Sequence, residues 1–290
     1  MNILVSSNEK YLKPLMVALY SLSLNTNENL IEVYFINVSV DNKKMEHFKK
    51  TMEKKIKKVK INIINIDYKK INIFQIKEHF SLETYSRLLL MDVIPERINR
   101  ILWLDADIIV HKNIDEFYNM DFENNALIAC ESINQNDEEN KKSLLFNDKQ
   151  LYFNAGVILF NLQYLREKYD NDYLMNYAIK NNGKLKWLDQ DVLNGTLGKE
   201  SKVINYQKYN YMHFSGTKFS KEEKKYLNQE NCIIHYIGPI KPWNFRFDCW
   251  TYVFWKQYAE KSRLYTKIFF WNNFILHKIY KFKIKKLRRT

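Results

Sequence analysis

Two carboxylates, Asp105 and Asp107, interrupt an otherwise apolar run between residues 101 and 110. An apolar run of this length is typical of a buried central strand. Burial of a carboxylate without a partner costs several kcal/mol, so two of them together call for a compensating cation. Residues two apart on a strand share a face, and their oxygens suit Mg²⁺ or Mn²⁺. The alternative is a pair of aspartates that cap the turn after a strand.

A histidine far along the chain could complete such a metal site. His235 follows the apolar pair Ile233 and Ile234, so we expect it at the end of another strand. Imidazole together with two carboxylates is a suitable ligand set for Mn²⁺. Gly238 would allow close backbone approach, and Lys241 could meet a phosphate as a point charge. A structural role for a lone histidine is the alternative.

Polar residues in three other segments could bind a ligand near this site. Asn154 precedes a pair of small residues and could offer its amide to a ligand, or it could occupy a turn. Asp189 and Gln190 could face a pocket from the start of a helix, or Asp189 could cap that helix. Arg87 lies in an otherwise apolar helical pattern, where it could be exposed or could reach a buried anion.

The segments that carry these residues alternate between strand and helix patterns. Strands alternating with helices predict an α/β fold with a parallel sheet covered by helices on both faces. In such sheets ligands bind beyond the carboxyl ends of the strands, where the two aspartates fall. We expect strands at residues 2–6, 31–40, 61–66, 101–104, 126–130 and 156–160, and helices after residue 14 and at 45–59, 84–91 and 161–180.

Composition limits the class of protein. The 290 residues, of which 46% are hydrophobic, are enough for one large α/β domain with appendages. Three widely spaced cysteines argue against a disulfide framework or a zinc ribbon, and they favour a reducing compartment. The first residues lack the basic start of a secretory signal peptide. These features predict a cytoplasmic location.

The basic charge is concentrated at the C-terminal end. Of the net +13, ten charges come from Lys and Arg in residues 261–290, which contain no Asp or Glu. Aromatic and aliphatic residues alternate with them between positions 264 and 280. The apolar stretch is too short to cross a bilayer, but it suits the interface of an anionic membrane. A nucleic-acid surface and a disordered tail are the alternatives, and we expect no nucleic-acid partner.

Five motifs together resemble family 8 of the retaining glycosyltransferases. They are Thr-Tyr-x-Arg-Leu, Leu-Asp-x-Asp, Phe-Asn-Ala-Gly-Val, Asp-Gln-Asp-x-Leu-Asn and His-Tyr-x-Gly-x-x-Lys-Pro-Trp. That family includes bacterial lipopolysaccharide galactosyl- and glucosyltransferases and the glycogenins. The resemblance implies a GT-A fold, a Rossmann-like nucleotide-sugar-binding sheet with flanking helices, over residues 1–250. Residues 251–290 would then form a helical, membrane-associating tail.

The resemblance also implies a ligand set. The donor would be UDP-galactose or UDP-glucose, held with Mn²⁺ or Mg²⁺, and the acceptor a saccharide or glycolipid. Residues 6–10 depart from the relatives' pattern at the expected nucleotide contact. Glu131 and Ser132 depart from it in the acceptor region, which leaves the acceptor open. The resemblance assigns the metal to Asp105, Asp107 and His235; the diphosphate to Gly238 and Lys241; the uridine to Ser6 and Asn8; the sugar to Arg87, Asn154, Asp189 and Gln190; and it adds Ala106, between the two aspartates, to the donor site.

Retention of the anomeric configuration requires a covalent intermediate or front-face attack. By resemblance, Gln190 lies nearest the β-face of the sugar, with Asp189 beside it, and an amide is a poor nucleophile. We therefore expect front-face attack, with a donor phosphate oxygen as the base. The expected role is lipopolysaccharide biosynthesis on the inner face of the bacterial inner membrane. The alternatives are a glycogenin-like primer that glucosylates its own tyrosine and a non-catalytic basic membrane-binding module.

Overall fold

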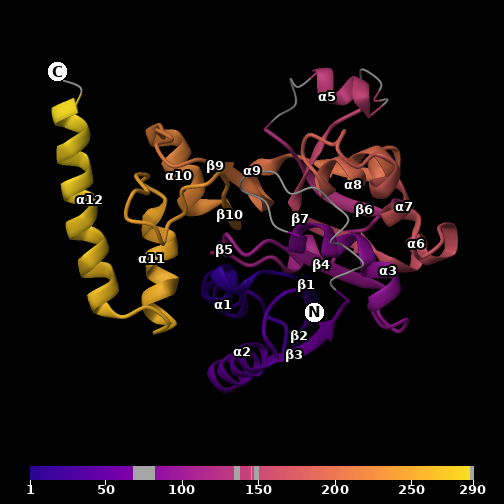
Figure 1. The fold of residues 1–290 in the computed structure, drawn as a ribbon, viewed down its shortest axis with the longest axis horizontal. Helices are drawn as coiled ribbons and strands as arrows, with labels where there is room; N and C mark the ends of the chain where they lie inside the picture. The colour runs from indigo at the N-terminus through magenta and orange to yellow at the C-terminus, as the bar shows by residue number, and fades with distance from the viewer. Residues whose placement is uncertain (68–81, 134–137, 145, 147–149, 288–290) are drawn as a thin grey trace.

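A seven-stranded sheet forms the centre of the molecule (Figure 1). The structure is a computed structural model that describes residues 1–67, 82–133, 138–144, 146 and 150–287. Within these residues the strand order is β3-β2-β1-β4-β7-β6-β8. The strands are Asn2–Val5 (β1), Ile31–Asn37 (β2), Val59–Asn65 (β3), Arg100–Leu104 (β4), Leu127–Glu131 (β6), Phe153–Asn161 (β7) and Ser201–Ile204 (β8).

The expectation of a wholly parallel sheet is wrong at β7. This strand pairs antiparallel with both β4 and β6, whereas β1, β2, β3 and β4 pair in parallel. Antiparallel neighbours need no crossover to the opposite end of the sheet, and residues 132–152, which include α5, join β6 to β7. As a result the start of β7 lies at the carboxyl end of β4, where the backbone N–H of Asp105 donates to the carbonyl of Gly156 at 2.9 Å.

Helices cover both faces of the sheet, as expected. Helices α1 and α2 pack on one face, and η2, α3, α6, α7 and α8 pack on the other. The predicted helix at 161–180 is wrong in one respect: a turn of Asp and Asn residues divides it into α6 and α7. The helices before the C-terminal region are Glu9–Leu24 (α1), Asn42–Lys55 (α2), the 3₁₀ helix Leu82–Leu89 (η2), Leu90–Val93 (α3), Asp115–Tyr118 (α4), Glu138–Ser143 (α5), Leu162–Lys168 (α6), Tyr173–Lys180 (α7), Asp189–Leu197 (α8), the 3₁₀ helix Gly198–Glu200 (η3), Tyr206–Tyr209 (α9) and Lys221–Gln229 (α10).

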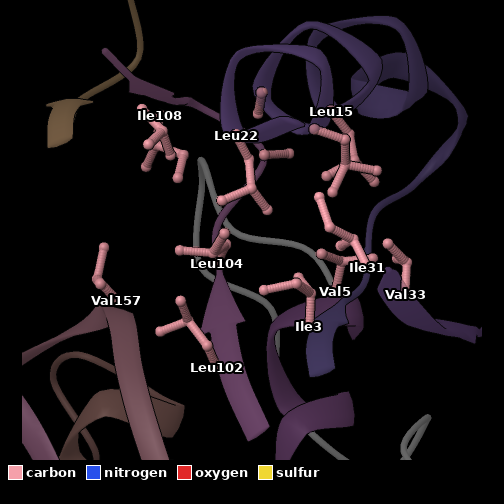
Figure 2. Close-up of a cluster of buried hydrophobic side chains, with 14 of the residues drawn as sticks. Ile3, Val5, Leu15, Leu22, Ile31, Val33, Leu102, Leu104, Ile108 and Val157 are labelled. Atoms are coloured by element: carbon pink, nitrogen blue, oxygen red, sulfur yellow. The ribbon is translucent and has the colours of Figure 1, made fainter. Parts of the chain in front are cut away.

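Side chains alternate across β4, which explains the long apolar run before the aspartates. Leu102 and Leu104 join the cluster beneath α1, where Figure 2 shows them beside residues of β1 and α1. Ile101 and Trp103 face the opposite cluster. Both faces of residues 101–104 are therefore buried, and the next position that is partly exposed is Asp105, where the turn begins.

A smaller sheet lies beside the main one. It has the order β5-β10-β9, with β5 at Ile108–Val110, β9 at Tyr211–His213 and β10 at Ile233–Tyr236. Strand β10 pairs antiparallel with β5 and parallel with β9. Residues 105–107 thus form the turn between the main sheet and this second sheet, and His235 lies on β10 directly opposite Ile108.

Two helices end the chain. Helix α11 (Tyr252–Lys261) buries Trp255, Tyr258 and Ala259 in a cluster with residues of α1 and β10. Helix α12 (Lys267–Leu287) lies at the edge of the molecule, drawn in yellow in Figure 1. Among the helices that the structure describes, none is both long and apolar enough to cross a membrane. The division of the chain at residue 250 stays a prediction.

Candidate active site

The structure brings Asp105, Asp107 and His235 together. Nε2 of His235 lies 3.3 Å from Oδ1 of Asp107 and 3.8 Å from Oδ2 of Asp105. The possible ligand atoms of all three residues lie within 4.8 Å of one another. The reading of the aspartates as turn caps does not explain this convergence with a histidine from a distant strand. Their role as metal ligands stays a prediction.

The second oxygen of each carboxylate is held by a cationic side chain. Oδ2 of Asp107 accepts from Nζ of Lys241, and Oδ1 of Asp105 accepts from Arg87 at 3.0 Å. The oxygens that remain, Oδ1 of Asp107 and Oδ2 of Asp105, are the ones that approach His235. Two carboxylate oxygens and an imidazole nitrogen fit a hard or borderline divalent cation such as Mn²⁺.

Electrostatics keep Asp107 ionised in this site. Burial would raise the pKa of this carboxyl, but the Lys241 ammonium and His235 outweigh burial and hold that pKa well below its usual range. Lys241 is itself buried and also donates to the carbonyl of Tyr236 at 2.7 Å. The predicted phosphate-binding lysine therefore lies directly beside the candidate metal ligands.

Gly238 adopts a backbone conformation that favours glycine. Its φ of 81° lies in the left-handed region. A Cβ atom at this position would also lie 2.7 Å from the ring of Phe214. The turn between His235 and Lys241 therefore depends on a glycine for two independent reasons.

Arg87 is buried, so its reading as a surface residue is wrong. Its guanidinium lies 4.0 Å from the centre of the Trp103 ring and donates to the carbonyl of Ala155. It also pairs with Asp105 at 3.0 Å and with Asp189 at 2.9 Å. This fork of donors links η2, β4, β7 and α8 at a single point.

Asp189 lies in the first turn of α8. Leu188 is the N-cap and has a φ of 53°, which places Asp189 one residue inside the helix, so its interpretation as the helix cap is wrong. Burial raises the pKa of Asp189 to about 7, although the Arg87 guanidinium opposes the shift. A backbone strained in this way beside a buried acid is typical of a functional site.

Gln190 and Asn154 contact each other through their amides. Nδ2 of Asn154 donates to Oε1 of Gln190 at 3.0 Å, and the backbone N–H of Ala155 donates to the same oxygen at 3.0 Å. Asn154 lies within β7, so its reading as a turn residue is wrong. The next residue of β7, Gly156, accepts from the backbone N–H of Asp105, which ties this part of β7 to the turn that carries the aspartates.

The predicted uridine contacts lie at the start of α1. The hydroxyl of Ser6 donates to the carbonyl of Ile36 at 2.8 Å. Oγ of Ser7 and Oδ1 of Asn8 are buried without a hydrogen-bond partner among the residues that the structure describes. Unpaired buried polar atoms are uncommon, so these two atoms fit a polar ligand better than Ser6 does. Ala106 is buried between the aspartates.

Three residues near this site were not predicted from the sequence. Tyr11 on α1 is close to both aspartates: burial first, and then the charges of Asp107 and Asp105, raise its pKa to about 12. Tyr152 and Asn210 are buried and hydrogen-bonded to predicted site residues. The position of Tyr11 in the first turn of the helix after the first strand was a usable signal, whereas the positions of the other two gave none.

Known proteins are similar to this chain in sequence and in fold. The model of the family "Glycosyl transferase family 8" matches residues 2–246. A putative glycosyltransferase of Haemophilus influenzae is 28% identical over 247 residues, covering 84% of this chain and 73% of that protein. A lipopolysaccharide 1,2-glucosyltransferase of Escherichia coli is 26% identical over 249 residues, covering 82% and 71%. A crystal structure of the galactosyltransferase LgtC with donor and acceptor sugar analogues has a TM-score of 0.77 at 22% identity, covering 90% of this chain and 96% of that one.

Proposed function

The chain belongs to glycosyltransferase family 8 and has the GT-A fold, and from this premise we propose that it transfers galactose or glucose from a UDP-sugar to a saccharide or glycolipid acceptor with retention of configuration. Enzymes of the family use nucleotide sugars and a divalent metal. The observation that carries the proposal is the convergence of Asp105 Oδ2, Asp107 Oδ1 and His235 Nε2 beside Lys241.

We propose that these three side chains hold Mn²⁺, with Mg²⁺ as the alternative. Such a cation, when bound, would neutralise charge that develops on the UDP leaving group. Lys241 would supply a second positive charge to the same diphosphate as a point charge. Oγ of Ser7 and Oδ1 of Asn8, both buried and unpaired in the described structure, would meet polar atoms of the nucleotide.

The contacts of Asp189, Gln190 and Asp191 favour front-face attack. Asp191 is fully buried and accepts from Tyr152 at 2.6 Å and from Asn140 at 2.8 Å. Asp189 is buried against Arg87, and the amide oxygen of Gln190 already accepts two hydrogen bonds. A nucleophile needs an accessible lone pair, so none of these groups is prepared for a covalent intermediate.

The proposed acceptor is a growing lipopolysaccharide or lipooligosaccharide. Relatives named lipopolysaccharide 1,2-glucosyltransferase and lipopolysaccharide 1,3-galactosyltransferase match across 82% and 84% of this chain. An enzyme that extends a lipid-linked saccharide works beside a membrane. We therefore also propose a cytoplasmic enzyme peripheral to the inner face of the inner membrane.

Helix α12 supports the membrane proposal because its two faces differ. One face contacts the rest of the protein: Asn273 donates to the carbonyl of Trp243 at 3.2 Å, and Lys281 pairs with Asp248 at 2.9 Å. The opposite face is apolar and exposed, and lysines flank it, an arrangement that suits an anionic lipid surface. The apolar residues are Ile268, Trp271, Ile275, Ile279 and Phe282, and they are 40% to 71% exposed.

Flotation with liposomes tests the membrane proposal. The double variant Trp271→Ser, Phe282→Ser should lose binding to vesicles that contain anionic lipid, whereas Val253→Ser, which removes an exposed apolar residue from α11, should bind as the wild type does. Equal binding of all three proteins would remove α12 as the membrane contact.

A panel of UDP-sugars tests the proposed activity. Purified protein with Mn²⁺ should hydrolyse UDP-galactose or UDP-glucose slowly in the absence of an acceptor, and EDTA should stop the reaction. Hydrolysis that is unchanged in EDTA would contradict the metal assignment. Label transferred from UDP-[¹⁴C]glucose to the protein itself would instead favour a glycogenin-like primer.

A further inference from the structure

A continuous chain of side-chain hydrogen bonds joins the start of α8 to the histidine of the candidate metal site. Its five links measure between 2.6 and 3.0 Å. It passes from α8 to the residue before β7 and back to α8, then to β7 and to the residue after α9, and it ends on β10. The members, in order, are Asp191, Tyr152, Gln190, Asn154, Asn210 and His235.

A carboxylate fixes the direction of the chain at the α8 end. Asp191 can only accept, and it receives the hydroxyl of Tyr152 at 2.6 Å and the backbone N–H of Trp187 at 2.7 Å. Because the Tyr152 hydrogen is donated to Asp191, the Tyr152 oxygen acts as the acceptor toward Nε2 of Gln190, 3.0 Å away. The nitrogen of the Gln190 amide therefore faces Tyr152.

Backbone N–H groups fix the two amides in the middle of the chain. The N–H of Ala155 donates to Oε1 of Gln190 at 3.0 Å, and the N–H of Gly156 donates to Oδ1 of Asn154 at 2.9 Å. A backbone N–H can only donate, so the acceptor atom in each amide must be the oxygen. Nδ2 of Asn154 then faces Gln190, and Oδ1 of Asn154 is left to accept from the next residue.

Asn210 links the oriented amide of Asn154 to the imidazole of His235. It is completely buried, and its Nδ2 donates to Oδ1 of Asn154 at 2.9 Å. Its Oδ1 therefore faces Nδ1 of His235, also at 2.9 Å. An amide oxygen can only accept, so Nδ1 of His235 must carry the hydrogen. In the neutral imidazole Nε2 then keeps its lone pair, and Nε2 is the atom that faces Asp105 and Asp107.

We infer that Asn210, oriented by the hydrogen-bond chain that starts at Asp191 and Tyr152, sets the tautomer of His235. In that tautomer Nε2 carries the lone pair that a metal ion needs. This inference rests on the proposed metal site and deepens it. A ligating histidine binds through an unprotonated nitrogen, and a partner on the other nitrogen fixes both the tautomer and the ring orientation. Asn210 is thus a positioning residue, which acts on the metal only through His235.

Nitrogen NMR of the metal-free protein tests this inference directly. Histidine labelled with ¹⁵N, at about pH 8 where imidazoles are neutral, reports which ring nitrogen carries the hydrogen. The His235 signals are assigned by their loss in His235→Gln. The wild type should show a protonated Nδ1 and a bare Nε2. A wild type with the hydrogen on Nε2 would overturn the inference without the need for any variant, and whether or not the protein transfers sugar.

Two buried-asparagine variants separate positioning from structural damage. Asn210→Leu should give mixed tautomers at His235 and lower the affinity for Mn²⁺, measured by calorimetry, about 10- to 100-fold. Asn231→Leu is the control, because Asn231 is equally buried and makes the same kind of bond to His111, at 3.1 Å. It should keep both the tautomer and the affinity.

Either of two results with these variants would overturn the inference: an unchanged tautomer and affinity in Asn210→Leu, or equal losses in both variants. If Asn210→Leu does not fold, Asn210→Ser is measured in its place. A wild type that binds no Mn²⁺ would contradict the proposed metal site but leave the tautomer assignment standing.

Discussion

His235 occupies the space that a side chain at position 156 would need. A Cβ atom on Gly156 would lie 2.3 Å from Cε1 and 2.9 Å from Nδ1 of the imidazole. The glycine on β7 therefore allows the histidine on β10 to approach the turn between the two sheets. This close approach joins the end of β4 to a strand more than a hundred residues further along the chain.

Gly156→Ala should displace His235 and lower kcat/KM with saturating Mn²⁺ by at least about tenfold, equivalent to about 1.4 kcal/mol. The physical reason is the clash of the new methyl group with the ring. Gly195→Ala on α8 is the matched control, because its Cβ would lie 2.4 Å from the hydroxyl of Tyr177, away from the candidate metal ligands. Equal activity of the two variants in steady-state assays would contradict this role of Gly156.

Arg87→Lys should also reduce transfer by at least about tenfold. A lysine keeps the charge but cannot contact Asp105, Asp189 and the carbonyl of Ala155 at once. Arg166→Lys provides the comparison, since Arg166 donates to the carbonyls of Ile94 and Ile98 at 2.8 and 2.9 Å. If both lysine variants are equally active, the guanidinium fork has no functional role.

Gln190→Ala should retain activity within about a hundredfold of the wild type, because loss of a true nucleophile costs on the order of a millionfold. The assay needs saturating Mn²⁺, since the same change interrupts the hydrogen-bond chain to His235. Mass spectrometry of the protein during turnover should detect no sugar on Asp189 or Asp191. A trapped glycosyl adduct on either residue would establish a covalent route instead.

The contribution of His111 to stability should fall as the pH falls through the acidic range. Burial lowers the pKa of His111 from 6.5 to about 4, against the opposing effect of its bond to Asn231. Between these values the unfolded chain binds a proton that the folded chain does not, so the unfolding free energy decreases as the pH falls. The contribution of His111 is fully present above about pH 6.5 and amounts to at most about 3 kcal/mol.

Urea denaturation at several pH values measures this contribution. His111→Gln should show a smaller decrease in unfolding free energy between about pH 6.5 and 4 than the wild type. His47→Gln, at an exposed position on α2, should follow the wild-type curve. Parallel curves for all three proteins would show that His111 does not carry the pH dependence.

Local sequence patterns were sufficient for much of the fold. The apolar run before Asp105 predicted a strand that is buried on both faces, and β4 is such a strand. The amphipathic pattern of Met45, Phe48 and Met52 predicted α2, and these three residues face the core. Such patterns depend on the period of one element, which the sequence contains directly.

The direction of β7 and the hydrogen-bond chain could not be predicted in the same way. An antiparallel and a parallel strand with both faces buried have the same apolar pattern, so β7 gave no signal of its direction. Asn210 follows a short helix and resembles any turn residue. Its contacts with Asn154 and His235, 56 and 25 residues away in the chain, exist only once three elements have packed together.

Binding of Mn²⁺ tests the central claim most directly. Calorimetry with UDP present should detect one Mn²⁺ site in the wild type, and Asp107→Asn should weaken it about a hundredfold or more. Asp121→Asn, at an exposed position outside the site, should bind as the wild type does. Equal affinity of the wild type and Asp107→Asn would contradict the proposal that Asp105, Asp107 and His235 hold the metal of a nucleotide-sugar site.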